Sequence, residues 1–440
     1  MLAATLLVFA LAAPGEPPGE PPPFPDPALV EALEAGRQGG RTRYYYREEE
    51  LPEYELPSVL DGVRTPEEWP ARREEIVRLF EQHVYGVAPP APDQMLIESN
   101  GIVQEDFETG ERTAEAWASV TLTCESPRGS FSFPITVVTP REATPDTPAP
   151  LFVLITHPAR MAKLGADGNP RSFPWDDTDF FPWKAIVAAG YAAAVLPAGE
   201  LAPDDRETFQ TKLLTASGLP EGVGEGRAAD APGNLAAWAW GASRVLDYAE
   251  RTDELDASRV AVLGHSRGGK TAWWAGARDP RFSVVISNES GCGGAALSRR
   301  QYGETVGLLT EVRPHWFCPR FAGYGGPKGT LKEAAMPVDQ HMLAAAIAPR
   351  AVYAASAAAD LNADPRGEFL SLVEANPAFE LFGDRALTPD DFPAVGGSVV
   401  RGRRGYHLRA GGHDLLREDW DRFLAFAATI WDEAADDAAP

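Results

Sequence analysis

The sequence predicts one α/β domain, a three-layer αβα sandwich in which helices cover both faces of a mostly parallel central sheet. From residue 149 onward, short segments that are apolar throughout alternate with segments of helical periodicity, a pattern typical of parallel strands buried on both faces. A glycine-rich turn around a serine joins one of these strands to the next helix. The 440 residues, 44% of them hydrophobic, are enough for one large core.

The start of the chain predicts export. Residues 1–13 (MLAATLLVFALAA) form an apolar run of signal-peptide length that ends in small residues, although the usual positive charges are missing. The run is too short to span a bilayer, so we expect cleavage near Ala12 or Ala13 and a periplasmic or extracellular protein; a misassigned start codon is the alternative. Residues 14–27, rich in Pro, Gly and Glu, predict a disordered linker before a folded domain over residues 28–435.

The first part of that domain combines helices with antiparallel strands. Residues 28–90 predict helices and loops that wrap the domain. Among them, TPEEWPARREEIVRLFEQHVYG has Thr65 as a candidate cap, acidic residues in its first turn and apolar residues at helical spacing. From about residue 97 to 140 the pattern alternates and is rich in β-branched residues, which predicts a hairpin or meander.

The rest of the domain alternates strands with helices. Buried strands are predicted at 149–159, in the second half of 181–200, and at 259–266, 281–290, 349–360 and 402–414. Helices are predicted in the first half of 181–200, at 233–250 and from 415 to about 431. Long insertions near 200–230 and 291–345 interrupt the alternation. The second is rich in glycine, proline and aromatic residues, so we expect it to form an ordered wall of a binding site.

Charge and cysteine content exclude several classes of function. The chain has 64 acidic and 40 basic residues and a net charge of −24, which argues against nucleic acid or an anionic membrane as a partner. Cys124, Cys292 and Cys318 lack metal-ligand spacing, so no metal site is predicted. At most one disulfide can form. Cys292 and Cys318 are the pair to consider because they lie in one segment, and the sequence leaves their pairing open.

The turn Gly264-His265-Ser266-Arg267-Gly268 fits G-x-S-x-G between a predicted strand and a predicted helix. A nucleophile elbow requires this context, because glycines permit a tight turn that presents the serine oxygen at the carboxyl edge of the sheet. The amide of Arg267 would point to the same place and could hold a developing oxyanion. Arg267 and Lys270 also place two cations near Ser266, suited to an oxyanion or a polar substrate; a surface pair is the alternative.

A serine nucleophile needs a base and an acid that orients the base, and in this fold class both follow the serine along the chain. His413, after a Gly-Gly turn and before the last helix, is the predicted base, whereas His407 lies in an apolar run and is predicted to be a core residue. Asp360 ends the penultimate strand, and Glu289 ends the strand after the nucleophile helix. Either acid could reach His413; otherwise Asp360 caps a helix and Glu289 anchors a loop.

The segment GHSRGGK resembles the signature Gly-x-Ser-Arg-x-Gly-Lys of the glucuronoyl esterases, the 4-O-methyl-glucuronoyl methylesterase family of carbohydrate esterases. The similarity spans roughly residues 65–432 and continues in ISNESGCGGAALSRRQYGETV, PHWFCPRF, PVDQHMLAAAIAPR, DLNADPRGEFLS and GGHDLLREDWDRFL. It is closer to bacterial members, because His265 stands where fungal members have cysteine. The resemblance implies an α/β-hydrolase fold and cleavage of the ester between a 4-O-methyl-glucuronic acid branch of xylan and an alcohol of lignin.

The resemblance also implies catalytic roles. Ser266 matches the nucleophile, His413 the base and Glu289 the acid after the sixth strand. Asp360 matches an acid that some bacterial members carry after the seventh strand, so the acid role can be shared. Arg267 matches the arginine that supports the oxyanion with its side chain as well as its amide.

The implied substrate contacts include one departure from the family pattern. Lys270 and Glu304 match residues that bind the sugar hydroxyls. Asn362 stands where bacterial relatives usually have a tryptophan that contacts the uronate. Because Asn362 can hydrogen-bond but offers no aromatic surface, the sugar affinity or the preferred uronate is expected to differ.

The expected enzyme acts as a monomer, without metal or organic cofactor, on a glucuronoxylan or lignin–carbohydrate ester. An acetyl-xylan or other carbohydrate esterase of the same fold is the first alternative, and a serine peptidase the second. Such a peptidase would need a propeller-like domain or an amine-recognising acid pair, and the N-terminal region is too short for a propeller. A non-catalytic glycan-binding protein is the third alternative, and the complete set of Ser266, His413 and acids argues against it.

Overall fold

The computed structural model describes residues 24–36, 45–102, 114–164, 175–218, 226–326, 330 and 332–437. The predicted signal peptide and residues 14–23 of the predicted linker lie outside these ranges. The described residues form a ten-stranded sheet in the order β1-β2-β3-β5-β4-β6-β7-β8-β10-β9. Its strands are β1 (Gln94–Ile102), β2 (Ala116–Ser126), β3 (Gly129–Thr139), β4 (Ala149–Thr156), β5 (Ala192–Pro197), β6 (Leu255–His265), β7 (Val284–Asn288), β8 (Ala351–Ala357), β9 (Ser398–Arg401) and β10 (Arg404–Arg409).

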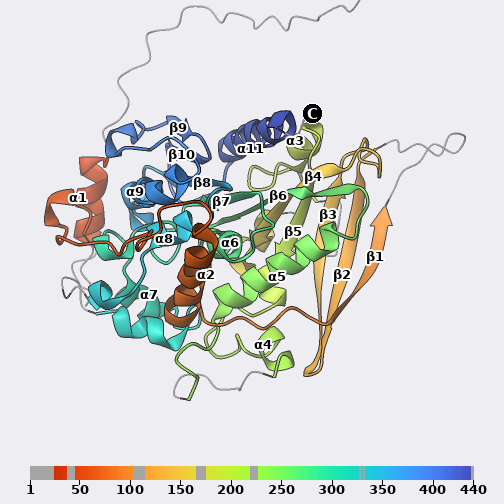
Figure 1. Cartoon of the computed structure of the whole chain (residues 1–440), viewed down its shortest axis with the longest axis horizontal. Coiled ribbons are helices and arrows are strands. Elements are labelled where there is room, and N and C mark those ends of the chain that lie inside the picture. Colours follow the sequence, from red (N-terminus) through yellow and green to blue (C-terminus); the bar gives the residue numbers. More distant parts are fainter. Residues whose placement is uncertain are drawn as a thin grey trace, which may run out of the picture.

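Helices precede, connect and follow these strands (Figure 1). They are α1 (Pro27–Gly36), α2 (Trp69–Phe80), α3 (Trp183–Ala188), α4 (Leu213–Ala216), α5 (Asn234–Ala249), α6 (Arg267–Arg278), α7 (Val306–Val312), α8 (Gln340–Ala345), α9 (Pro365–Glu374), α10 (Asn376–Glu380) and α11 (Arg417–Asp437). Each helix and strand predicted from residue 149 onward is present, with ends that differ by a few residues.

The sheet is parallel in its centre and antiparallel at its sides. Strands β5, β4, β6, β7, β8 and β10 pair in parallel along that order. The predicted meander is confirmed as β1, β2 and β3, and β9 closes the other side against β10. The parallel centre brings the carboxyl ends of β6, β7, β8 and β10 together at one edge, where an open α/β sheet usually binds its ligand.

Two hydrophobic layers sandwich the sheet, as the sequence predicts. On β4, Leu151 and Val153 belong to the core cluster that includes buried residues of α2, α5, α6 and α8, whereas Phe152 and Leu154 belong to the cluster that includes α3 and α11. In Figure 1, α5 crosses in front of the strands, and α11 lies beside α3 at the top of the view. Because successive side chains of a strand point to opposite faces, a continuous apolar run buries both faces.

Helix α6, which follows the elbow, lies very close to the sheet. Trp273 and Trp274 are fully buried. At Gly276, a Cβ atom would lie only 2.2 Å from the side chain of Val285 on β7. A glycine is therefore required for this close approach, which fixes the start of α6 against the strands.

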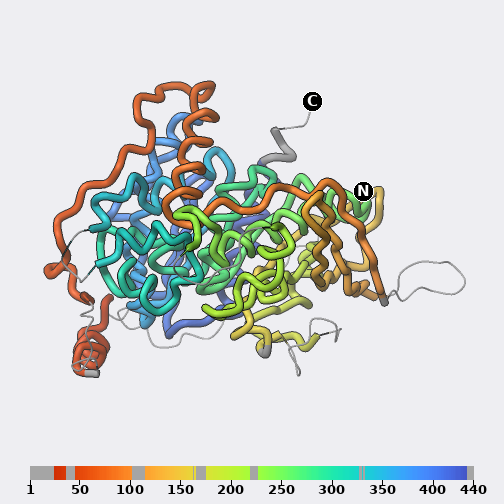
Figure 2. Tube along the Cα trace, turned by 90° about the horizontal axis from the view of Figure 1, so that it is seen from below, coloured from red at the N-terminus to blue at the C-terminus, as the bar shows by residue number. Residues whose placement is uncertain are grey.

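The chain before β1 wraps around the domain (Figure 2). Tyr45 forms a β-bridge with Tyr302, and Phe24 packs 5.5 Å from the ring of Phe392, so the last residues of the predicted linker belong to the fold. The prediction that Thr65 caps a helix is wrong, because α2 begins at Trp69 after a turn in which the Glu68 amide donates to the Thr65 carbonyl at 3.2 Å. The proline that follows Trp69 suits the first turn of a helix, since its missing N–H would have no partner there.

The three cysteines are free and buried. Cys292 Sγ lies 3.8 Å from Ser298 Oγ, and Cys318 Sγ lies 3.9 Å from the Gln82 carbonyl oxygen. The disulfide considered between Cys292 and Cys318 is therefore not formed.

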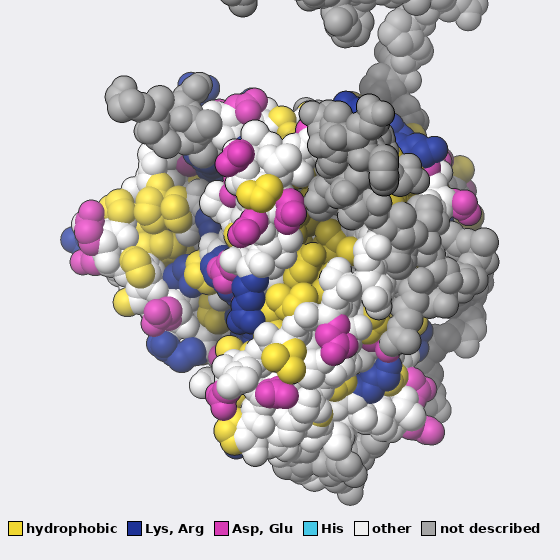
Figure 3. All heavy atoms as spheres, turned by 90° about the vertical axis from the view of Figure 1, so that its right-hand side faces the viewer, with side chains coloured by type: hydrophobic (Ala, Val, Ile, Leu, Met, Phe, Trp, Pro, Cys, Tyr) yellow, Lys and Arg dark blue, Asp and Glu magenta, His cyan; other side chains and the backbone are white. Residues whose placement is uncertain are grey.

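The surface carries charge of both signs. On the face beyond β1, acidic, basic and apolar side chains are interspersed among the described residues, so the net negative charge does not gather there into one patch (Figure 3). Within the described ranges, no helix combines the length and apolar character needed to cross a membrane.

Candidate active site

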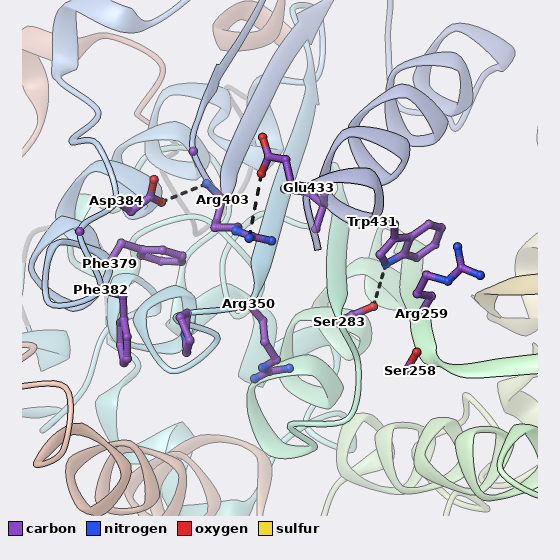
Figure 4. Close-up of a pocket in the computed structure, with 14 residues that line it drawn as sticks. Ser258, Arg259, Ser283, Arg350, Phe379, Phe382, Asp384, Arg403, Trp431 and Glu433 are labelled. Atoms are coloured by element: carbon purple, nitrogen blue, oxygen red, sulfur yellow. Dashed lines mark hydrogen bonds and ion pairs between the residues drawn. The ribbon is translucent and has the colours of Figure 1, made fainter. Parts of the chain in front are cut away.

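Two hollows lie at opposite edges of the sheet. The larger, about 910 Å³, is lined by residues before the strands, including Ser283 before β7 and Arg403 before β10 (Figure 4). Its polar groups bind one another: Trp431 Nε1 donates to Ser283 Oγ at 3.0 Å, and Arg403 pairs with Glu433 at 4.0 Å. The smaller, about 260 Å³, lies at the carboxyl edge and contains Ser266. Only this smaller hollow combines a histidine with a serine among its described lining residues.

Ser266 sits in a strained turn between β6 and α6. Its backbone has φ 60° and ψ −126°, a region that costs a non-glycine residue energy and that persists where the surrounding structure enforces it. A Cβ atom on Gly264 would lie 2.3 Å from the Gly268 carbonyl carbon, so this turn needs a glycine at that point. The amide of Ser266 donates to the Asn288 carbonyl at 2.9 Å and thereby ties the turn to β7. The strand, turn and helix of a nucleophile elbow are thus present.

His413 lies in the same hollow with both predicted acids. Its Nδ1 atom is 2.6 Å from Oδ2 of Asp360 and 3.2 Å from Oε2 of Glu289. Burial would lower the pKa of His413, but the hydrogen bonds and charges of the two acids outweigh it and raise that pKa to about 9. His407, by contrast, is fully buried, with Nε2 2.7 Å from Asp419 and Nδ1 3.1 Å from Tyr353, which confirms it as a core residue.

The two acids differ in their surroundings. Burial raises the pKa of Glu289 to about 8 even though His413 and Arg409 oppose that rise. Arg409 on β10 forms an ion pair with Glu289 Oε1, and the Asp414 amide donates to Oε2 at 3.0 Å. The guanidinium of Arg409 also donates to the carbonyls of Gly412 and Asp414 at 2.8 and 2.7 Å, so one side chain holds both Glu289 and the His413 loop.

His265 supports the other side of His413, with ring centroids 4.4 Å apart. Its Nε2 atom accepts from Arg160 at 3.1 Å, and its Nδ1 lies 2.6 Å from the Asn288 side-chain oxygen. Burial first, and then the charge of His413, hold the pKa of His265 well below its usual range. A neutral imidazole therefore packs against the base.

Arg267 is held by two residues from the insertions. Its guanidinium forms an ion pair with Asp204, from the first insertion, and stacks on Trp316, from the second, with Cζ 4.7 Å from the ring centroid. The second insertion thus forms an ordered wall beside Ser266, as the sequence predicts. The sequence analysis did not identify Asp204 as a site residue. Its partner Arg267 lies 63 residues away along the chain, so no local motif links the two.

Lys270 is buried in the floor of the hollow. Its Nζ atom donates to the carbonyls of Ser290 and Cys292, the latter at 2.6 Å, and lies 3.2 Å from Glu304 Oε2. The predicted alternative of a surface pair is wrong, because Lys270 is only 3% exposed. The structure therefore brings Lys270 and Glu304 together, as the resemblance implies.

Asn362 lines the hollow beside Glu304. Its side-chain oxygen accepts from the Tyr46 hydroxyl at 2.8 Å, and its carbonyl accepts from the Glu304 amide at 2.9 Å. The N-terminal wrap, which supplies Tyr46, therefore reaches the wall of the hollow.

Glu289, Asp360 and His413 are also the one group of potential metal ligands found among the described residues, with ligand atoms within 4.8 Å of one another. Both carboxylates lie within hydrogen-bonding distance of His413 Nδ1, so hydrogen bonds account for the close approach of the three side chains. The arrangement therefore fits a base and its orienting acids.

Comparisons with known proteins relate the chain to carbohydrate esterases. Residues 226–383 match the family model for glucuronyl esterase of fungi. The chain is 34% identical over 417 residues to carbohydrate esterase MZ0003 of an unknown prokaryotic organism, which covers 87% of this chain and 91% of that protein. The solved structure of a glucuronoyl esterase from Solibacter usitatus is 33% identical, covers 88% of this chain and 100% of its own, and superposes with a TM-score of 0.74. A 4-O-methyl-glucuronoyl methylesterase from Schizophyllum commune is 26% identical over 76% of this chain and 74% of that protein.

Proposed function

Because the chain belongs to the glucuronoyl esterase family of carbohydrate esterases and is a carboxylic ester hydrolase with an α/β-hydrolase fold, we propose that it cleaves the ester between a glucuronic acid branch of xylan and an alcohol of lignin. The observation that carries this proposal is the hollow in which Ser266 lies with His413 and with the pair formed by buried Lys270 and half-buried Glu304. The first group supplies acyl-transfer chemistry, and the second supplies the Glu304 carboxylate, held by Lys270, as an acceptor for sugar hydroxyls.

In the first half of the reaction, His413 takes the proton of Ser266 Oγ while that oxygen attacks the C6 carbonyl carbon of the uronate ester. The oxyanion that forms is stabilised by the Arg267 amide and guanidinium. His413 then gives its proton to the alcohol oxygen as the ester bond breaks, which leaves the uronate acylated on Ser266. Asp360 and Glu289 stabilise the imidazolium through Nδ1.

In the second half, water attacks the acyl carbon, and His413 again accepts the proton. The same oxyanion donors act, and collapse of the intermediate restores Ser266 and releases the uronic acid. The reaction as proposed requires no group beyond these side chains, the ester and water.

Within the acid pair, we assign the main role to Asp360. Its carboxylate is nearer to His413 Nδ1, at 2.6 Å against 3.2 Å for Glu289. The charge of Glu289 is matched by Arg409, and burial disfavours its ionised form. Among the described residues, His413 is the one ion-pair partner found for Asp360, whereas Glu289 is shared between His413 and Arg409.

The test is the hydrolysis of benzyl glucuronate and of acetylated xylan by the wild type and by Ser266→Ala. The proposal expects wild-type turnover of the glucuronate ester to exceed that of the acetyl ester, and the Ser266→Ala variant to be inactive on both. Preference for the acetyl ester would favour an acetyl-xylan esterase. Failure of Ser266 to react with a fluorophosphonate would favour a glycan-binding protein. Export and a monomeric state remain part of the proposal, to be checked by N-terminal sequencing of secreted protein and by light scattering.

A further inference from the structure

We propose that Asp204 is a positioning residue for the oxyanion side chain: it holds the Arg267 guanidinium beside Ser266 and compensates its charge. This inference rests on the proposed role of Arg267 in the reaction. It adds a residue to which neither the sequence nor the comparisons assign a role.

Both carboxylate oxygens of Asp204 are bound by neighbouring side chains. One oxygen, Oδ2, pairs with the Arg267 guanidinium. The other, Oδ1, lies 2.7 Å from Trp316 Nε1 and 3.1 Å from His315 Nε2, both donors from the second insertion. Burial would raise the pKa of Asp204, but these three donors outweigh it and hold that pKa well below the usual range. Asp204 is therefore an ionised carboxylate whose two oxygens are both engaged.

Trp316 fixes the guanidinium from a second direction. Its ring lies under Arg267, with 4.7 Å between Cζ and the ring centroid, while its N–H is bound by Asp204. The Arg267 guanidinium is thus paired with the Asp204 carboxylate and stacked on the Trp316 ring. Together these two contacts restrict its position and its tilt. A free arginine loses rotamer entropy when it is ordered, and here that ordering precedes substrate binding.

The first turn of α5 secures the two loops that supply these partners. The side-chain amide of Asn234 donates to the carbonyl of Pro203, the residue before Asp204, at 2.6 Å. The backbone amide of Asn234 donates to the His315 carbonyl at 2.9 Å. The following amide, of Leu235, donates to the Trp316 carbonyl at 3.2 Å. Asp204 and Trp316 are therefore anchored to one rigid helix, as a preorganised site requires.

The ion pair with Asp204 also compensates the positive charge of Arg267. Arg267 pairs with Asp204, and Lys270 pairs with Glu304, so each cation of the hollow faces a carboxylate. The ester substrate is uncharged at the reacting carbon, whereas the released uronic acid is an anion at neutral pH. A compensated Arg267 still donates to a transient oxyanion, but it attracts a free carboxylate less strongly than an unpaired guanidinium would. The pairing therefore favours release of the product.

A double-mutant cycle tests the proposal, with Asp204→Asn, Arg267→Ala and the combined variant assayed for kcat and KM on benzyl glucuronate. Asp204→Asn keeps the side-chain shape but removes the ion pair, so kcat should fall about 10- to 100-fold with KM nearly unchanged. In the Arg267→Ala background the same substitution should cost almost nothing. Equal losses in both backgrounds would show a merely structural role and overturn the proposal.

Two further measurements separate this inference from the proposed function. The second-order rate of Ser266 labelling by a fluorophosphonate depends on the same oxyanion donors but on no sugar, so the cycle can be repeated with it even if glucuronate esters are not substrates. Inhibition by free glucuronate should become about tenfold stronger in Asp204→Asn, because an unpaired guanidinium attracts the carboxylate. Unchanged inhibition would contradict charge compensation.

Controls exclude general effects on folding. Asp256→Asn breaks an Arg–Asp pair of the same kind, with Arg259 Nε 2.6 Å from Asp256, at the opposite end of β6, and should leave kcat and glucuronate inhibition unchanged. If Asp204→Asn lowers the melting temperature strongly, Trp316→Phe provides a second variant, since it keeps a smaller aromatic ring for Arg267 to stack on and removes the Nε1 donor to Asp204. It should lower kcat less than Asp204→Asn does, and a normal kcat in both variants would refute the positioning role.

Discussion

Replacing the two acids by their amides should have unequal effects. The Asp360→Asn variant removes the carboxylate 2.6 Å from His413 Nδ1, and Glu289→Gln removes the one at 3.2 Å. In Asp360→Asn, Glu289 can still orient the imidazole, so the loss in kcat should be about 10²-fold rather than the roughly 10⁴-fold seen when a lone triad acid is replaced. In Glu289→Gln, Asp360 still orients the imidazole from 2.6 Å and the single amide oxygen can accept from Arg409, so the loss should be less than about tenfold.

The pH profile provides the sharper measurement. His413 must be neutral to act as a base, and the acids raise its pKa to about 9, so kcat/KM of the wild type should rise with pH up to that region. Loss of a nearby carboxylate lowers an imidazole pKa by about 1–3 units. Because the His413 side chain is 39% exposed, solvent screening favours the lower end of that range. The rise should therefore move about one unit toward lower pH in Asp360→Asn.

The same profile measured for Glu289→Gln is the matched control, because each variant changes one carboxylate to an amide. Its midpoint should shift by less than that of Asp360→Asn. If the midpoint of Asp360→Asn equals that of the wild type, or if Glu289→Gln loses as much activity as Asp360→Asn, the assignment of Asp360 as the main acid is refuted.

Three further predictions concern the rest of the site and the fold. Arg267→Ala should lower kcat on benzyl glucuronate about 10²- to 10³-fold, and near-normal turnover would remove the guanidinium from the mechanism. Glu304→Gln keeps an acceptor beside Lys270 but accepts hydrogen bonds from sugar hydroxyls more weakly. The KM for glucuronate esters should therefore rise, while fluorophosphonate labelling of Ser266 should stay unchanged. A parallel loss of labelling would contradict a role in sugar binding. Reductant should not change the melting temperature, because Cys292 and Cys318 are not bonded, and a clear decrease would show a disulfide.

The sequence by itself determined the layered fold and the candidates for the reacting groups. Strands buried on both faces must be apolar throughout, so their pattern is visible locally, as in the β4 run around Phe152. The elbow at Ser266 is equally local, because the turn needs a glycine at Gly264, where a Cβ atom would lie 2.3 Å from the Gly268 carbonyl carbon. The order of serine, acid and histidine along the chain then identified Asp360, Glu289 and His413 as candidates without any coordinates.

Only the tertiary structure decided how those groups are supported and which acid lies nearer. The 2.6 and 3.2 Å distances from His413 depend on how two separate strand ends and a third loop meet. The pairing of Arg409 with Glu289 joins residues 120 positions apart, and that of Asp204 with Trp316 joins residues 112 apart. Such contacts leave no periodicity or spacing in the sequence, because a buried ion pair is specified by packing around it rather than by its neighbours along the chain. The sequence could therefore name the candidate reacting groups, whereas only the folded chain places the charged side chains around them.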